Sequence, residues 1–376
     1  MPPSRAKVVR TASVLALAGA AVASARALIR PRDDTERRLL DWEEVLRVAG
    51  GRSGEADRIR PLVATRLAAE YDGMASALAP LMAEVCGQPP RTFPHFTVLD
   101  RHGFIEVNLD IVRRLLAPVE KLRAEIPESF ATAMSRRVMS RYVGEMFGFM
   151  SQRVLGQYDP VLMLPAADSA SPPATALYLV EPNVSTFQHK LDVPADDLRR
   201  WLILHELTHA WQFEMHPWLG EHLGKLMNDL LMSGLLEEVR GNGASKLSAK
   251  EMVQRLPSQV RTQLRGVGEI QAIMSVLEGY SNFVMHRVGR GHIARFDELE
   301  KAFHKRKSQR SLLERLVLAI TGVNMKLRQY EVGERFCEAV TKGGGDINRV
   351  WEGPKMMPSM AELKDASIWL ARTRRG

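Results

Sequence analysis

The chain has 376 residues, of which 45% are hydrophobic and 26% charged, so it can bury one large core or two smaller ones and is not a disordered polymer. Its formal net charge of +8 is a mild basic excess spread along the chain, without the arginine–glycine or aromatic–basic repeats of nucleic-acid-binding proteins, so we expect no nucleic-acid partner. Cys86 and Cys337 lie far apart and match neither a disulfide scaffold nor a thiolate zinc site.

The N-terminal segment has the pattern of a signal peptide. Basic residues at Arg5, Lys7 and Arg10 precede an uncharged run over residues 11–25 that ends in small side chains. The run is shorter than the roughly twenty residues that cross a bilayer, and its alanines also suit a first helix. We therefore predict a cytoplasmic protein, with export or membrane association through residues 11–25 as the alternative.

Most of the remaining chain has helical periodicity. Proline- and glycine-rich breaks divide it into an apolar segment at 1–30, a helical region at 31–94 and one larger domain at 95–376. The predicted helices span residues 34–50, 57–85, 107–124, 127–155, 195–216, 219–236, 249–256, 266–288, 296–305, 312–321, 326–341 and 359–372.

Two short apolar runs bounded by prolines, at 161–164 and 176–180, are typical of strands, and a surface loop at 166–174 separates them. The fold class is therefore mostly α with a small β-sheet. Because the second strand shortly precedes the predicted helix at 195–216, residues 176–180 are a candidate edge for pairing with an extended peptide; the alternative is a plain core strand.

The predicted helix at 195–216 carries a specific chemical pattern, His-Glu-x-x-His. Residues four apart lie on one face of a helix, so His205 and His209 can present two imidazole nitrogens to one metal ion. Glu206 can reach a water on that metal as its general base. Pro194 and Pro217 bound the helix and place the histidines near its middle. The alternative is a pair of satisfied core histidines.

A catalytic zinc ion takes three protein ligands and leaves one position open. The candidates for the third ligand are His216, His222, Glu237, Glu238, Glu269, Glu278 and His286. Glu278 is preferred because it is a lone carboxylate in an apolar helical stretch, and Gly279 beside it permits close approach of a second helix. Asn282, one turn further on, is placed to hydrogen-bond a ligand. Alternatively, Glu278 pairs with an arginine such as Arg287 or faces water.

Together, these residues resemble the zincin-like metallopeptidases of actinobacterial type, whose substrates are uncharacterised and some of which are labelled as associated with deazaflavin-coenzyme biosynthesis. The similarity covers residues 95–372 and rests on Val98–Arg101 with Asn108 and Leu115–Pro118, Gln157–Asp159 with Glu181–Asn183, His205–His209 with Pro217–Leu219, Leu277–Gly279, and Gln329–Phe336 with Asn348–Trp351. It implies a mostly helical zincin-like fold in which a second helix supplies a glutamate ligand. Tyr280 stands where we expect the family to carry histidine, so no role of that histidine transfers.

The sequence therefore predicts a zinc-dependent hydrolase, a metallopeptidase acting on a peptide or protein. Zn²⁺ would be held by His205, His209 and Glu278, and Glu206 would activate its water and deliver the proton to the leaving amine. The oxyanion needs a further donor, for which Tyr280 and Tyr330 are candidates, each with a packing role as the alternative. A second hypothesis is a non-proteolytic zincin-like protein with a structural or binding role.

Overall fold

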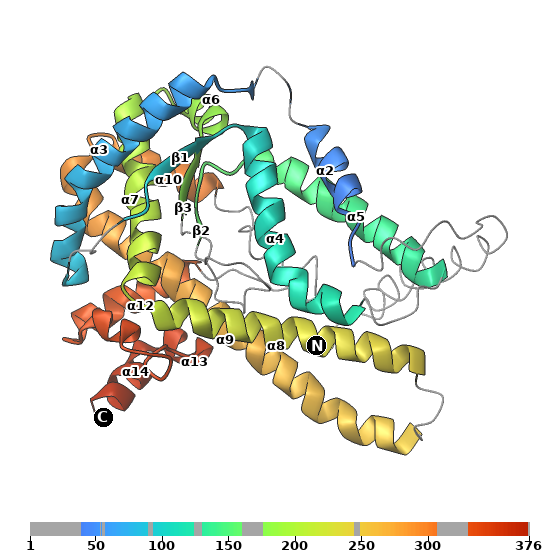
Figure 1. Cartoon of the computed structure of the whole chain (residues 1–376). Helices are drawn as coiled ribbons and strands as arrows, with labels where there is room; N and C mark the ends of the chain where they lie inside the picture. The colour runs from blue at the N-terminus through green and yellow to red at the C-terminus, as the bar shows by residue number, and fades with distance from the viewer. Residues whose placement is uncertain are drawn as a thin grey trace, which may run out of the picture.

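The computed structural model describes residues 39–52, 54, 57–88, 93–123, 130–159, 176–243, 249–306 and 330–374. It is mostly helical with one small sheet, as the sequence predicts (Figure 1). The helices are α2 (Trp42–Gly50), α3 (Pro61–Cys86), α4 (Arg101–Arg123), α5 (Phe130–Ser151), α6 (Glu181–Leu191), α7 (Ala195–Glu214), α8 (Pro217–Gly243), α9 (Ala249–His292), α10 (Phe296–Arg306), α12 (Tyr330–Lys342), α13 (Met360–Lys364) and α14 (Ala366–Thr373), with a 3₁₀ turn η2 (Ile347–Trp351). The strands are β1 (Phe96–Leu99), β2 (Gly156–Asp159) and β3 (Ala176–Val180).

The helix ends follow local sequence signals. The Asp41 side chain accepts a hydrogen bond from the Glu44 backbone N–H and caps α2. Helix α3 begins at Pro61, where a missing N–H costs nothing. It ends at Cys86 and is followed by Gly87, whose φ of 79° is the left-handed conformation that favours glycine. Of the predicted helix at 34–50, residues 34–38 lie outside the part that the structure describes.

The three strands form a sheet in the order β1-β3-β2. Strand β1 pairs with β3 in parallel, with Val98 opposite Leu179, and β2 pairs with β3 antiparallel, with Tyr158 opposite Leu177. Strand β3 is thus the central strand, so the prediction that residues 176–180 offer a free edge to a peptide is wrong. The alternative, a plain core strand, is the one observed, and both Leu177 and Leu179 are fully buried.

Strands β1 and β2 are absent from the sequence prediction because both mix polar with apolar residues, unlike the uninterrupted apolar runs at 161–164 and 176–180. The predicted strand at 161–164 and the loop at 166–174 lie outside the described residues. Strand β2 packs directly against α7, so one edge of the sheet borders the helix that carries the His-Glu-x-x-His pattern.

Helix α7 lies in the core, between the sheet and the helices α3 and α9 (Figure 1). Pro194 precedes it, Asp196 and Asp197 lie in its first turn, and it ends just before Pro217, as predicted. Its buried apolar residues are Leu198, Trp201, Leu202, Ile203, Leu204, Leu207, Ala210 and Trp211. Buried residues therefore lie on every side of the helix, as is typical of a helix in a core.

The two helices predicted at 249–256 and 266–288 are one, α9, which continues past Pro257 and runs alongside α8 (Figure 1). The C-terminal prediction at 359–372 is divided instead into α13 and α14 at Asp365, whose side chain accepts a hydrogen bond from the Ser367 N–H and begins the second helix. The predicted helix at 312–321 is not among the described residues.

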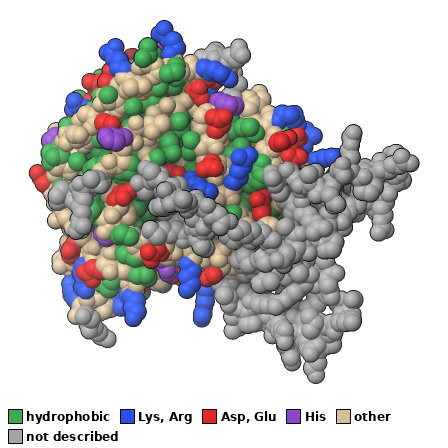
Figure 2. All heavy atoms as spheres, viewed as in Figure 1, with side chains coloured by type: hydrophobic (Ala, Val, Ile, Leu, Met, Phe, Trp, Pro, Cys, Tyr) green, Lys and Arg blue, Asp and Glu red, His purple; other side chains and the backbone are tan. Residues whose placement is uncertain are grey.

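No helix in the described ranges is long and apolar enough to cross a membrane. This finding corrects the localisation inferred from the sequence, in which an apolar N-terminal segment could anchor the chain; residues 11–25 themselves lie outside the described part. On the face drawn in Figure 2, basic and acidic side chains are interspersed among apolar ones.

Candidate metal centre

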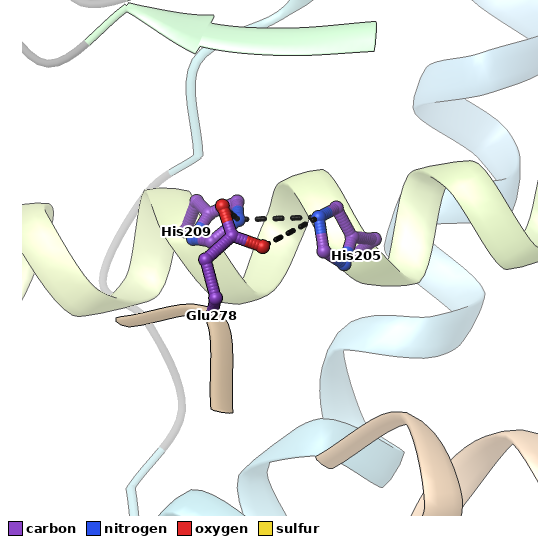
Figure 3. A group of neighbouring side chains, drawn as sticks. All are labelled: His205, His209 and Glu278. Atoms are coloured by element: carbon purple, nitrogen blue, oxygen red, sulfur yellow. Dashed lines mark hydrogen bonds and ion pairs between the residues drawn. The ribbon is translucent and has the colours of Figure 1, made fainter. Parts of the chain in front are cut away.

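The three side chains predicted to bind metal lie together (Figure 3). His205 and His209 extend from the same face of α7, and their Nε2 atoms are 3.2 Å apart. Glu278 reaches them from α9, with 3.9 Å from Oε2 to His205 Nε2 and 3.9 Å from Oε1 to His209 Nε2. The side chains of His205, His209 and Glu278 keep 23%, 15% and 17% of their surface exposed, so water can reach the group they form.

The Nδ1 atoms of both histidines face neutral partners that the sequence analysis did not single out. His209 Nδ1 lies 2.9 Å from Gln212 Oε1, and His205 Nδ1 lies 3.3 Å from Ser281 Oγ. The Ser281 hydroxyl also donates to the His205 carbonyl, which leaves its oxygen to accept from the ring. Gln212 could have been found from its place three residues after His209, on the same face of the helix.

The Glu206 side chain lies against strand β2 of the sheet. It is buried, with 6% of its surface exposed, and the backbone N–H of Tyr158 in β2 hydrogen-bonds to it. A Cβ at Gly156 would lie 2.7 Å from Glu206 Oε1, so this strand needs glycine where the carboxylate rests. Burial, and secondarily the charge of Glu278, raises the pKa of Glu206 to about 8, while the Tyr158 N–H opposes that shift.

The position of Glu278 depends on a close crossing of two helices. A Cβ at Gly279 would lie 2.2 Å from the carbonyl carbon of Gly333 in α12, and one at Gly333 would lie 1.8 Å from the Ser275 carbonyl oxygen. Only glycine at both positions lets the two backbones approach so closely. The close approach expected at Gly279 is therefore observed, with α12 as the second helix.

The other third-ligand candidates have different partners. His216 Nδ1 lies 3.0 Å from the Gln212 carbonyl oxygen, and its ring stacks on Trp351. His222 pairs with Glu269 at 2.9 Å. The Glu237 and Glu238 side chains lie outside the described part of the structure.

His286 belongs to a second group, with Glu334 and Glu338 of α12. Its Nδ1 lies 2.9 Å from Glu334 Oε1, and its Nε2 hydrogen-bonds to Glu300 of α10. Glu338 pairs with Lys342 at 3.1 Å. The carboxylates of this group are thus paired with the side chains of His286 and Lys342.

The predicted tyrosine donors and Asn282 have other surroundings. Tyr280 is fully buried, stacks on Trp211 and donates to Asn348 Oδ1 at 2.6 Å. Because residues two apart point to opposite sides of a helix, Tyr280 is directed away from Glu278, and this placement makes it a packing residue instead of an oxyanion donor. The Asn282 amide donates to Glu334 Oε2 at 3.4 Å and so connects α9 to α12. The Tyr330 side chain is outside the described residues.

The donor set fits zinc. Tetrahedral zinc with bonds of about 2.0–2.1 Å places its ligand atoms about 3.3 Å apart. The two imidazole nitrogens and the carboxylate oxygens are separated by 3.2–3.9 Å, and two nitrogens with one carboxylate form a common catalytic zinc set. These three residues could therefore hold the ion without rearrangement of the helices.

Comparisons with known proteins agree with this geometry. A family model described as zincin-like metallopeptidase matches residues 40–370. Among solved structures, the chain is similar to one from Chloroflexus aurantiacus described as "a putative hydrolase with a novel fold", with 31% sequence identity and a TM-score of 0.69, covering 90% of this chain and 100% of the other. A search of curated proteins finds no match.

Proposed function

The chain belongs to the zincin-like metallopeptidase family, and from this premise we propose that it is a zinc-dependent peptidase whose metal is held by His205, His209 and Glu278. The observation that carries the proposal is the convergence of these donors from two helices beside a buried carboxylate, Glu206. Zinc, when bound, supplies Lewis-acid chemistry by polarising a carbonyl and lowering the pKa of a water ligand.

The chain's own contribution is to move a proton. Glu206 follows His205 directly on α7, so its carboxylate is held close to the donors without occupying a ligand position. The Tyr158 N–H fixes that carboxylate against β2. A carboxylate held beside the metal donors can accept a proton from water and pass it to the leaving nitrogen of a peptide bond.

The direct test is Glu206→Gln. The amide keeps the size of the side chain but cannot accept the proton, so hydrolysis of a broad peptide library should fall by about 10²–10⁴-fold while the zinc content stays at the wild-type value. Asp196→Asn is the matched control: it makes the same chemical change on an exposed position of the same helix and should keep wild-type activity.

Full activity of Glu206→Gln would overturn the general-base role. A wild-type chain that binds zinc but cleaves nothing in the library would contradict the peptidase proposal and favour a non-proteolytic zincin-like protein.

A further inference from the structure

Gln212 connects the two helices that carry the proposed zinc ligands. It lies on α7, three residues after His209, and its side chain is completely buried. Its Oε1 is 2.9 Å from His209 Nδ1, and its Nε2 donates to the Leu277 carbonyl oxygen of α9 at 2.9 Å. Leu277 immediately precedes Glu278, so one amide touches one ligand directly and the backbone beside another.

The Leu277 carbonyl determines which way the amide points. A carbonyl oxygen can only accept a hydrogen bond, so the NH₂ end of Gln212 must face it. The reverse orientation would set two oxygens against each other, and the Gln212 oxygen would have no donor there. The oxygen of the amide therefore faces His209.

The amide in turn determines the protonation of His209. An amide oxygen only accepts, so the hydrogen bond at 2.9 Å requires the proton of a neutral His209 ring to be on Nδ1. The lone pair is then on Nε2, the atom that faces His205 and Glu278. A metal ion binds through that lone pair. The Leu277 carbonyl of α9 sets the orientation of the Gln212 amide, and the amide in turn keeps the ligand atom of His209 on α7 free of hydrogen.

We propose that Gln212 is a positioning residue, which fixes His209 in the tautomer with the proton on Nδ1 and ties α7 to α9 at Leu277 so that Glu278 meets both histidines. This role rests on the proposed function, in which His205, His209 and Glu278 bind zinc. Gln212 itself does not touch the metal or the substrate.

Zinc affinity, measured by chelator competition, tests this role. Gln212→Met has a similar length but neither donor nor acceptor, and it should weaken zinc binding by about 10–100-fold, the usual effect of losing the hydrogen-bond partner of a ligand. Gln212→Glu, in its protonated form, can accept from His209 and donate to Leu277, so it should recover most of the affinity.

Thr208→Val is the matched control. Thr208 is also buried on α7, but its hydroxyl donates to the Leu204 carbonyl and approaches Met82, so zinc affinity should not change. The thermal midpoint of each metal-free variant separates structure from positioning. A Gln212→Met chain with a lower midpoint but wild-type zinc affinity would overturn the proposal.

A second measurement needs no substitution. Nitrogen NMR of the metal-free wild-type chain, with ¹⁵N-labelled histidine, reports which ring nitrogen carries the proton. The proposal requires a His209 whose Nδ1 is protonated and whose Nε2 is not; the opposite tautomer would overturn it. A wild-type chain that binds no zinc would instead refute the metal centre on which the inference rests, so the two failures are distinguishable.

Discussion

Helix α9 contributes side chains to two groups of histidines and carboxylates. The two groups differ in the hydrogen-bond partners of their imidazole Nδ1 atoms. In the group of His205, His209 and Glu278, the Nδ1 atoms face a neutral hydroxyl and a neutral amide. In the group around His286, carboxylates of Glu334 and Glu300 face both ring nitrogens. Ionised carboxylates only accept, so these two contacts favour the form of His286 with hydrogen on both nitrogens, the cation.

The difference separates a metal ligand from an ion pair. A neutral acceptor on Nδ1 leaves the lone pair of Nε2 available, whereas two carboxylates use both nitrogens. The hydrogen bond that the His286 ring donates to Glu334 is the main cause that raises the pKa of His286, and the charges of Glu334 and Glu300 add to it against the opposing effect of burial. We therefore expect zinc at the first group and a proton at the second.

The largest expected effect is on zinc content. Glu278→Ala removes a ligand and should weaken zinc binding by more than about 100-fold, beyond what loss of a ligand's hydrogen-bond partner costs. Glu334→Ala truncates a glutamate of similar exposure, 14% against 17%, in the other group and should leave zinc binding unchanged. Metal analysis after dialysis against micromolar zinc measures both.

Equal zinc loss in the two variants, or loss in Glu334→Ala alone, would contradict the comparison. Retention of zinc by Glu278→Ala would move the third ligand to another residue, and Glu269→Ala and His222→Ala would then be the next variants to analyse.

A smaller effect is expected at the helix crossing between the two groups. Gly333→Ala places a Cβ against the Ser275 carbonyl oxygen, so α12 must move away from α9, at a cost of about 1–3 kcal/mol or more in the free energy of unfolding. Gly268→Ala, also in this helix pair, meets nothing within 4 Å and should stabilise the chain by about 0.5–1 kcal/mol. Urea unfolding of metal-free protein measures both; equal stability of the two variants would contradict the close crossing.

Sequence patterns predict the helices and the site residues of this protein where a helical period continues over many residues. The position of α7, the pairing of His205 with His209, and Glu278 as their neighbour follow from helical spacing and from an isolated carboxylate in an apolar stretch. The sheet order does not follow, because β1 and β2 mix polar with apolar residues and because pairing joins residues far apart in the chain.

Hydrogen-bond partners across helices are equally inaccessible from the sequence. In the sequence, only its spacing from a predicted metal ligand distinguishes Gln212 from the other polar residues of α7, because its partner, the Leu277 carbonyl, belongs to another helix. Likewise, Asn282 is one turn from Glu278, but its amide points to Glu334 because α12 crosses α9 there. Spacing within a helix predicts faces; it does not predict which element covers each face.

The smallest effect concerns pH and tests the cationic state of His286. Its ring meets Glu300 of α10 and Glu334 of α12, while Arg290 of its own helix lies 3.8 Å from Glu300 and the Phe296 ring packs edge-on. Because the folded pKa is raised, the stabilisation by this group is fully present below the unfolded pKa of about 6.5 and is lost as pH rises through the folded value. His286→Gln should therefore lower the thermal midpoint by about 1–3 °C near pH 6 and by less as the pH rises.

His222→Gln is the control, because His222 is paired with a single, half-exposed carboxylate, Glu269. A midpoint difference for His286→Gln that stays constant from acid to mildly alkaline pH would mean that the ring is not held as a cation, and the contrast between the two groups would then be lost.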